Sequence, residues 1–585
     1  MSTPDEVASF SRRSRAVARD FLHTVVVVDD QAFYPASVPA PEGLELIIEP
    51  DPSIGVDLEE DVPSGPQFTP RGAPTSDGDK EPIDLVQVDG PTHNLDAKAL
   101  IDAFAEEHIV CSILRPIRRD EPLEARTLAL AQRADLVVLD WVLNKDDGIQ
   151  TLNLIQRMLT EDRGRLRLIA IYTAEQNLAG ILDRLAVVKV ADESLSWERR
   201  DNFTVEWGAT RLVVFAKQPE AGTMGKSDSP AQLQGREVGV AALPTRLIEE
   251  FAEMIGGLVP NLALRALATL RASTYPILQN LHKGLDAPYI THRTLLPHPE
   301  DAADHLVTLV VGAVHALLEQ REVAAEAGGE AVASWLNEAS RSRSTPFKLP
   351  QLTEDQIRAF MAGRALEDLS QGRGDTLAKS LTGEILGGKA QAKPVQADQE
   401  YAMKMMIRPW DVADGHPPVL HLGMIVQRLS PPEEQQIPAT EDVSLDDRLG
   451  EKEDPSYLLC MQPLCDSARL KAATAFPFLP FHKVEPTEKT SVIVPNGMGI
   501  FAHLSLKPTP SRCEMVVFEP NPDKRVVRAE KDGEGFVFRS RSGVSFRWVA
   551  ELKPEQAQRW ANDYAATLSR VGVDESEWLR RLGKK

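Results

Sequence analysis

The sequence has few cysteines and an excess of acidic over basic residues. Only four cysteines occur among 585 residues: Cys111, Cys460, Cys465 and Cys513. They are scattered too widely for a disulfide scaffold or a paired zinc site. The formal net charge is −22, whereas a surface that binds nucleic acid needs a basic stripe. We therefore expect no nucleic-acid partner and no role as a DNA-binding regulator.

Signals for secretion or membrane insertion are also missing. The first residues carry Asp5, Glu6 and several arginines, without the apolar segment of a signal peptide. The run LVTLVVGAVHALL within His305–Gln320 is flanked by charge, and it is too short for a membrane span, so we expect a buried bundle helix there. These absences predict a cytoplasmic protein that does not bind membranes.

Four short apolar runs each end in a polar or charged residue. They are Thr24–Asp30 (TVVVVDD), Asp135–Asp140 (DLVVLD), Leu168–Thr173 (LIAIYT) and Arg211–Lys217 (RLVVFAK). Runs of Val, Ile and Leu bounded by polar residues are typical of strands buried on both faces of a parallel sheet. In open α/β sheets ligands bind beyond the carboxyl ends of the strands. We therefore expect the polar residues that end these runs to meet in one crevice.

Helical patterns separate these runs. We expect helices at Pro4–His23, Asn94–Glu107 (with Asn94 as N-cap), Leu123–Ala134 and Ile149–Leu159, and a further strand at Ile109–Leu114. This alternation predicts a doubly wound, five-stranded parallel sheet. Residues 35–91 are dense in Pro, Gly, Asp and Glu, which favours a surface insertion, with a lid over the acidic pocket as the alternative.

The residues that end the strands suit phosphoryl transfer. Asp29 and Asp30 would repel one another unless a cation joined them, and an all-oxygen pocket suits Mg²⁺. Asp140 can act as a carboxylate nucleophile toward a phosphoryl group. The Thr173 hydroxyl and the Lys217 ammonium would bind the oxygens of that group. Each residue alone is more often a helix cap, a turn hydroxyl or a solvated charge, but their joint occurrence in this order favours a site.

This set resembles the receiver (CheY-like) domains of bacterial two-component response regulators. The similarity rests on the double acid Asp29–Asp30, Leu139–Asp140, Thr173–Ala174 and Lys217, and it extends from about Thr24 to Gly257. The resemblance implies that Asp140 is the phosphoacceptor and that a sensor histidine kinase is the donor. It also implies that Asp30, Asp140 and the backbone carbonyl of Val142 bind Mg²⁺, with Asp29 binding through water.

The sequence departs from the receiver pattern in several places. Extra segments follow Asp30 and span about Val187–Ala209, and Gln218 separates Lys217 from Pro219. The family's aromatic switch position is Val214, with Phe215 beside it. We therefore expect intact acceptor chemistry and an altered route of signal output.

The rest of the chain divides by pattern into further regions. We predict a receiver domain over residues 1–257, a helical bundle over 258–388, a linker over 389–400 and a mostly antiparallel β (α+β) domain over 401–585. We expect a final helix from Pro554 to about Leu582 to pack on this last domain. The bundle would form a homodimer or dock a histidine-containing partner. Its candidate acceptors are His305 and His315, and His315 is predicted to be a core histidine because it lies in an apolar run.

One other segment carries reactive side chains. Cys460, Cys465, Asp466 and Arg469, with His482, would form a thiol or metal pocket. Their spacing is not that of a zinc knuckle, and buried strand cysteines are the simpler interpretation.

The architecture as a whole resembles the separate receiver component of Detocs-type anti-phage phosphorelays. That resemblance implies a phosphate buffer that drains stray signal, and a second receiver-bearing effector as competing acceptor. We expect a phosphoacceptor, with autodephosphorylation at most, and no turnover enzyme. The alternatives are a scaffold that keeps the receiver fold only for binding and, less favoured, an enzyme centred on Cys465.

Overall fold

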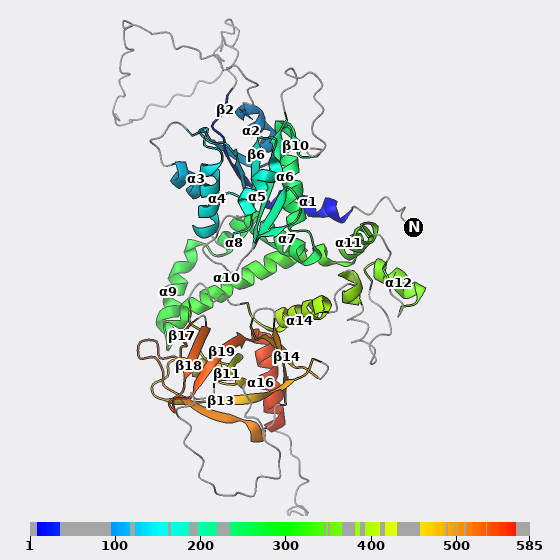
Figure 1. Ribbon diagram of the computed structural model, residues 1–585. Helices are drawn as coiled ribbons and strands as arrows, with labels where there is room; N and C mark the ends of the chain where they lie inside the picture. The colour runs from blue at the N-terminus through cyan, green and yellow to red at the C-terminus, as the bar shows by residue number, and fades with distance from the viewer. Residues whose placement is uncertain are drawn as a thin grey trace, which may run out of the picture. The chain divides into compact units, whose positions relative to one another are not determined.

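The computed structural model describes residues 9–34, 95–116, 123–161, 165–186, 197–218, 235–343, 347–348, 352–364, 381–386, 392–409, 416–429, 457–486, 489–497, 500–507, 510–533 and 535–568. The chain forms two compact units (Figure 1). The first comprises Met1–Pro346 with Asp355–Leu366, and the second comprises Phe347–Glu354 with Glu367–Lys585. The predicted insertion at 35–91 and the chain beyond Leu568 lie outside the described residues.

A mostly parallel sheet forms the centre of the first unit. Its five parallel strands run in the order β4 (Val110–Leu114), β1 (Thr24–Val28), β5 (Leu136–Leu139), β6 (Arg167–Thr173) and β9 (Thr210–Lys217). This order confirms the predicted doubly wound receiver fold.

Three further strands extend the sheet beyond β9. The antiparallel strands β8 (Thr204–Trp207) and β7 (Glu198–Arg199) come from the segment that departs from the receiver pattern. The short strand β10 (Glu237–Val238) pairs in parallel with the last two residues of β9. Strand β9 therefore pairs with β6 and, through different residues, with β8 and β10.

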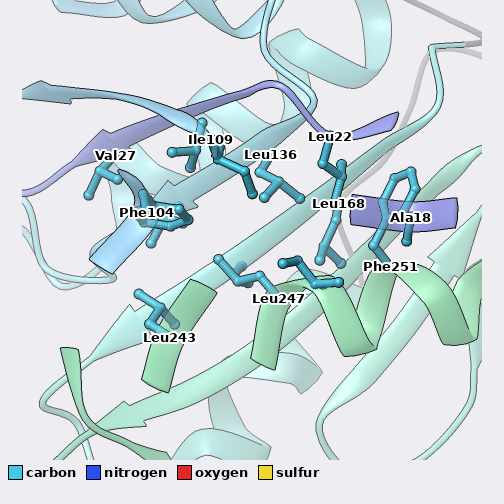
Figure 2. Packing of buried hydrophobic residues seen from close by; sticks show 14 of the residues in the cluster. Ala18, Leu22, Val27, Phe104, Ile109, Leu136, Leu168, Leu243, Leu247 and Phe251 are labelled. Carbon is cyan, nitrogen blue, oxygen red and sulfur yellow. The ribbon is translucent and has the colours of Figure 1, made fainter. Parts of the chain in front are cut away.

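Helices cover both faces of this sheet, which is why its strands are apolar throughout. Along β1, Val25 and Val27 face one core, while Val26 and Val28 face the other. The first core is closed by α1 (Phe10–Phe21), α2 (Ala97–Glu106) and α6 (Leu243–Met254), as Figure 2 shows. The second is closed by α3 (Leu123–Ala131), α4 (Ile149–Glu161) and α5 (Leu178–Ala186).

The start of α2 differs from the prediction. Its N-cap is Asp96, whose carboxylate accepts from the backbone N–H of Ala99 at 2.9 Å. Asn94 was predicted as the cap, but the residues Leu95–Asp96 form β3, which pairs with β2 (Ala32–Phe33). Because this strand pair takes up the chain before the helix, the helix begins at Ala97.

Further helices follow α6 in the same unit. They are α7 (Leu258–Ala272), α8 (Thr274–Asn280), α9 (Asp286–Leu295), α10 (Asp301–Gln320), α11 (Gly329–Arg341) and α12 (Glu354–Met361). Leu264 and Ala268 of α7 join the core beneath α1. The predicted helical region therefore begins by packing on the receiver sheet.

Helix α10 is not the buried bundle helix that we predicted. Only Ala302 and Leu317 are buried in it, and His315, predicted to lie in a core, has a side chain that is 73% exposed and pairs with Glu319. At 20 residues α10 is also not too short for a membrane span, and among the described helices it alone meets the length and composition of one. An apolar run predicts that a helix has an apolar surface, but it does not predict which part of the protein covers that surface.

The second unit contains an antiparallel sheet, as predicted for the C-terminal region. Its strands are β11 (Met424–Arg428), β12 (Tyr457–Cys460), β13 (Thr474–Val484), β14 (Val492–Pro495), β15 (Phe501–Leu506), β16 (Glu514–Phe518), β17 (Glu530–Asp532), β18 (Gly535–Arg539) and β19 (Ser545–Glu551). Helix α16 (Pro554–Leu568) packs on this sheet through Trp560. The predicted linker differs, because α14 (Ala392–Met406) occupies most of it.

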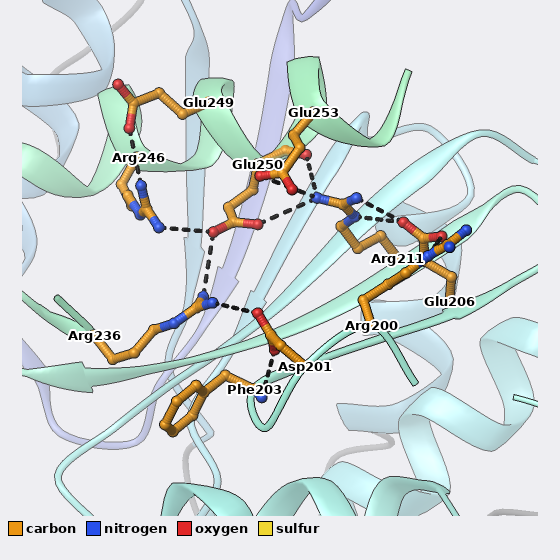
Figure 3. A network of polar contacts seen from close by, with 10 residues as sticks. All are labelled: Arg200, Asp201, Phe203, Glu206, Arg211, Arg236, Arg246, Glu249, Glu250 and Glu253. Carbon is orange, nitrogen blue, oxygen red and sulfur yellow. Dashed lines mark hydrogen bonds and ion pairs between the residues drawn. The ribbon is translucent and has the colours of Figure 1, made fainter. Parts of the chain in front are cut away.

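A buried ionic network joins α6 to the extra strands of the first unit (Figure 3). Glu250 of α6 is only 3% exposed, and its carboxylate accepts from three guanidinium groups. These belong to Arg211 at 3.3 Å, Arg236 at 3.2 Å and Arg246 at 3.0 Å. One carboxylate thus connects β9, the residue that precedes β10 and its own helix.

We expect Glu250→Ala to lower the free energy of unfolding by about 3–5 kcal/mol, because it leaves the buried Arg211 guanidinium with less compensating charge. The matched control is Glu253→Ala on the same helix. Glu253 is 76% exposed and 3.9 Å from Arg211, so its loss should cost less than about 1 kcal/mol. Urea titration of both variants measures the difference, and equal losses would contradict the role assigned to Glu250.

Candidate functional site

The parallel strands bring four chain segments to one edge of the sheet. Asp29 follows β1, Asp140 follows β5, and Thr173 and Lys217 end β6 and β9. The backbone N–H of Asp140 donates to the carbonyl of Val28 at 2.9 Å, which continues the ladder between β1 and β5. The register of this ladder sets Asp29 and Asp140 side by side.

Lys217 links two of the carboxylates directly. Its Nζ donates to Asp29 Oδ2 at 2.7 Å and to Asp140 Oδ2 at 2.8 Å. All three side chains are nearly buried, at 6%, 2% and 7% exposed respectively. Buried charges need partners of opposite sign. The Lys217 ammonium supplies such a partner to both carboxylates and so allows them to lie buried at the end of the sheet.

Asp30 adds a third carboxylate to the cluster. Its Oδ2 accepts from the backbone N–H of Asn144 at 2.9 Å, in the turn after Asp140. Its Oδ1 is buried and has no hydrogen-bond partner within the described part of the chain. The three carboxylates offer oxygen atoms that all lie within 4.8 Å of one another.

The charges of this cluster do not balance without a further cation. Three carboxylates face one ammonium group, and burial raises the pKa of Asp140 above its usual value although Lys217 opposes the shift. Burial likewise raises the pKa of Asp30. Burial would lower the pKa of Lys217, but the Asp140 and Asp29 carboxylates outweigh it and raise the pKa. A divalent cation with oxygen ligands would relieve both the excess charge and the unpartnered Asp30 oxygen, so the residues fit Mg²⁺.

The turn after Asp140 is held in place by specific contacts. Thr151 Oγ1 donates to the backbone carbonyl of Asp140 at 2.7 Å. Gly148 has φ +83°, and a Cβ there would lie 2.4 Å from the Trp141 ring, so only glycine fits. Val142, predicted to offer its carbonyl to the metal, is half-buried in this turn.

Thr173 lies at the same edge, next to the strand that carries Lys217. It pairs with Ala216 in the ladder between β6 and β9 and is 1% exposed. Its Oγ1 accepts from the backbone N–H of Glu175 at 3.3 Å. The structure therefore brings Asp29, Asp30, Asp140 and Lys217 together and places Thr173 at the same edge of the sheet, and their individual roles remain predictions.

Tyr172 is a residue at this edge that the sequence analysis did not single out. Its ring centroid lies 5.8 Å from Lys217 Nζ, and its hydroxyl donates to the backbone carbonyl of Val238 at 2.8 Å. Burial raises the pKa of Tyr172, so the hydroxyl keeps its proton. The run LIAIYT predicted a buried strand, and within it a tyrosine looks like another core residue.

The cysteine segment does not form a comparable site. Cys460 is fully buried in β12, where burial raises its pKa to about 12, and Cys465 is exposed. The ring of His482 contacts Arg512 instead. Among the described residues, the only group of metal-binding side chains is the acidic cluster of the first unit.

Comparison with known proteins agrees with this geometry. Residues 21–221 match the model of the response receiver domain family, so this part of the chain is a receiver domain. Receiver domains bind Mg²⁺ in their acidic pocket and interact with histidine kinases or phosphotransfer partners. No curated protein and no solved structure matches the chain.

We expect Asp30→Asn to weaken Mg²⁺ binding by about 10-fold or more, because the unpartnered Oδ1 loses its charge. Asp147→Asn is the control, since Asp147 lies in the same turn as Asn144 but has a side chain that is 85% exposed. Isothermal titration calorimetry with MgCl₂ measures both affinities. A similar loss in the two variants would mean that Asp30 is not a ligand.

Proposed function

We propose that this protein is a response-regulator-like phosphoacceptor, in which Asp140 receives a phosphoryl group from a phosphohistidine of a sensor histidine kinase. The observation that carries the proposal is the Lys217 bridge. Its Nζ lies 2.8 Å from the Asp140 carboxylate and 2.7 Å from Asp29, and Asp30 stands beside them. This is the charge arrangement that phosphoryl transfer requires at its acceptor.

Asp140 is the nucleophile in the proposed reaction. One of its carboxylate oxygens forms a bond to phosphorus as the N–P bond of the donor breaks, and the electron pair returns to the donor imidazole. The product is an aspartyl phosphate. Burial of Asp140 limits competing reaction with water, because its side chain is only 7% exposed.

The neighbouring side chains stabilise the charge that moves. The Lys217 ammonium is placed to shift from the Asp140 carboxylate to an oxygen of the arriving phosphoryl group. Thr173 would donate its hydroxyl to a second oxygen, and Asp29, Asp30 and Asp140 would hold Mg²⁺. Bound there, Mg²⁺ supplies positive charge to the phosphoryl oxygens.

In this proposal the protein is a stoichiometric acceptor and not a turnover enzyme. Slow loss of the phosphoryl group would use water admitted past Glu175, which is exposed and follows Thr173 by two residues. A phosphate buffer for an anti-phage relay, competing with a second receiver-bearing effector, is the finer role that we propose. The net charge of −22 supports an output other than DNA binding.

We expect acetyl phosphate with Mg²⁺ to place one acyl phosphate on Asp140, detected by mass spectrometry of the intact protein and its peptides. Asp140→Asn removes the nucleophile and should abolish the label, and chelation of Mg²⁺ should lower its rate at least about 100-fold, since the phosphoryl charge is then uncompensated.

The control is again Asp147→Asn, which should label like the wild type because its carboxylate is exposed. A receiver-fold scaffold makes the opposite prediction, since Asp140→Asn would then leave partner affinity and cellular activity unchanged. Unlabelled wild-type protein, with a cognate kinase as well as with acetyl phosphate, would contradict the proposal.

A further inference from the structure

Two histidines on the α9–α10 hairpin are in direct contact. His292 Nε2 and His305 Nδ1 are 3.0 Å apart, and their ring centroids are 5.3 Å apart. His292 lies in the last turn of α9, and His305 lies in the first half of α10. Both side chains are exposed.

The surroundings leave the outer edge of the His305 ring accessible. Residues 303–312 of α10 are exposed on every side of the helix. Leu309 is 56% exposed and Ile290 on α9 is 61% exposed. No described contact involves His305 Nε2, so a phosphorylated partner can reach it. Exposed apolar side chains of this extent are unusual on a surface that meets only water.

The contact between the two rings has a chemical consequence. When His305 carries its proton on Nδ1 and donates it to His292 Nε2, the lone pair of His305 Nε2 faces solvent. A nucleophile held against a base by a hydrogen bond of this length is the arrangement that activates side chains for covalent transfer. His315, on the same helix, contacts the Glu319 carboxylate, and no second imidazole among the described residues pairs with it.

We propose that His305 is a phosphoryl-accepting histidine and that His292 takes its proton. The donor is an aspartyl phosphate of a receiver domain, the group that the proposed function places on Asp140, so the inference rests on that function. His305 Nε2 forms a bond to phosphorus as the O–P bond of the acyl phosphate breaks, which returns a carboxylate. The Nδ1 proton passes to His292 Nε2, and the step is reversible.

The first experiment isolates His305 from Asp140. Full-length protein carrying Asp140→Asn is incubated with phosphoramidate, whose N–P bond can phosphorylate an imidazole without an aspartyl intermediate. We expect an acid-labile, alkali-stable phosphate on His305, located by mass spectrometry of peptides. His305→Gln should remove it, and His315→Gln should retain it.

His292→Gln tests the second histidine. We expect the initial rate of labelling to fall about 100-fold, the usual contribution of a general base, while the final level matches the parent protein. Unchanged circular dichroism of the variants separates this effect from misfolding. An unchanged rate in His292→Gln, or equal labelling of His305 and His315, would overturn the proposal.

The second experiment supplies acetyl phosphate and Mg²⁺ to the protein with Asp140 intact. Label should appear first on Asp140 and then on His305. Label that stays on Asp140 would refute the exchange between the two residues. Protein that labels on His305 with phosphoramidate but never on Asp140 would refute the proposed function and leave His305 as an acceptor for a phosphorylated partner.

Discussion

The bridge from Lys217 to Asp29 and Asp140 is the constraint on which the first unit depends. Buried carboxylates at adjacent strand ends are tolerated because one ammonium group lies 2.7 and 2.8 Å from them. That position exists only in one register of β9, where Val213 and Phe215 face the same core as α1. A slip of one residue would turn Lys217 to the opposite face of the sheet. The same register of β9 is therefore needed both to bury Val213 and Phe215 and to place Lys217 beside the two carboxylates.

The sequence predicted those parts of the site that local pattern determines. Each acidic, hydroxyl or basic residue ends its own apolar run, and parallel strands deliver their ends to one edge. Features built by pairing between distant segments were not predictable in this way. Strand β10 is two residues long and exists only against β9, and Tyr172 gains its partner Val238 from that pairing. The exposure of His315 depended on what covers α10, which a hydrophobic run does not encode.

The edge of the receiver sheet beyond β9 is occupied in this protein. Strand β8 pairs with the first half of β9, and β10 pairs with Ala216 and Lys217. The Tyr172 hydroxyl donates to the backbone carbonyl of Val238 in β10. Arg236, next to β10, donates to the carboxylate of Glu250 in α6. Strand β9, which ends in Lys217, thus also carries Arg211 of the buried ionic network. At one of the departures from the receiver pattern, the backbone N–H of Gln218 donates to the carbonyl of Val238 at 3.2 Å, which a proline at that position could not do.

The placement of α1 links the beginning of the chain to segments made much later. Ser11 in α1 donates its backbone N–H to Glu338 at 3.0 Å, across 327 positions of sequence, and the core under α1 includes Leu264 and Ala268 of α7. Contacts of such separation form late and slow folding. During synthesis the receiver sheet would leave the ribosome before Glu338 and α7 are made. Until then the apolar side chains of α1 that pack on α7 would stay uncovered, and a chaperone could bind them.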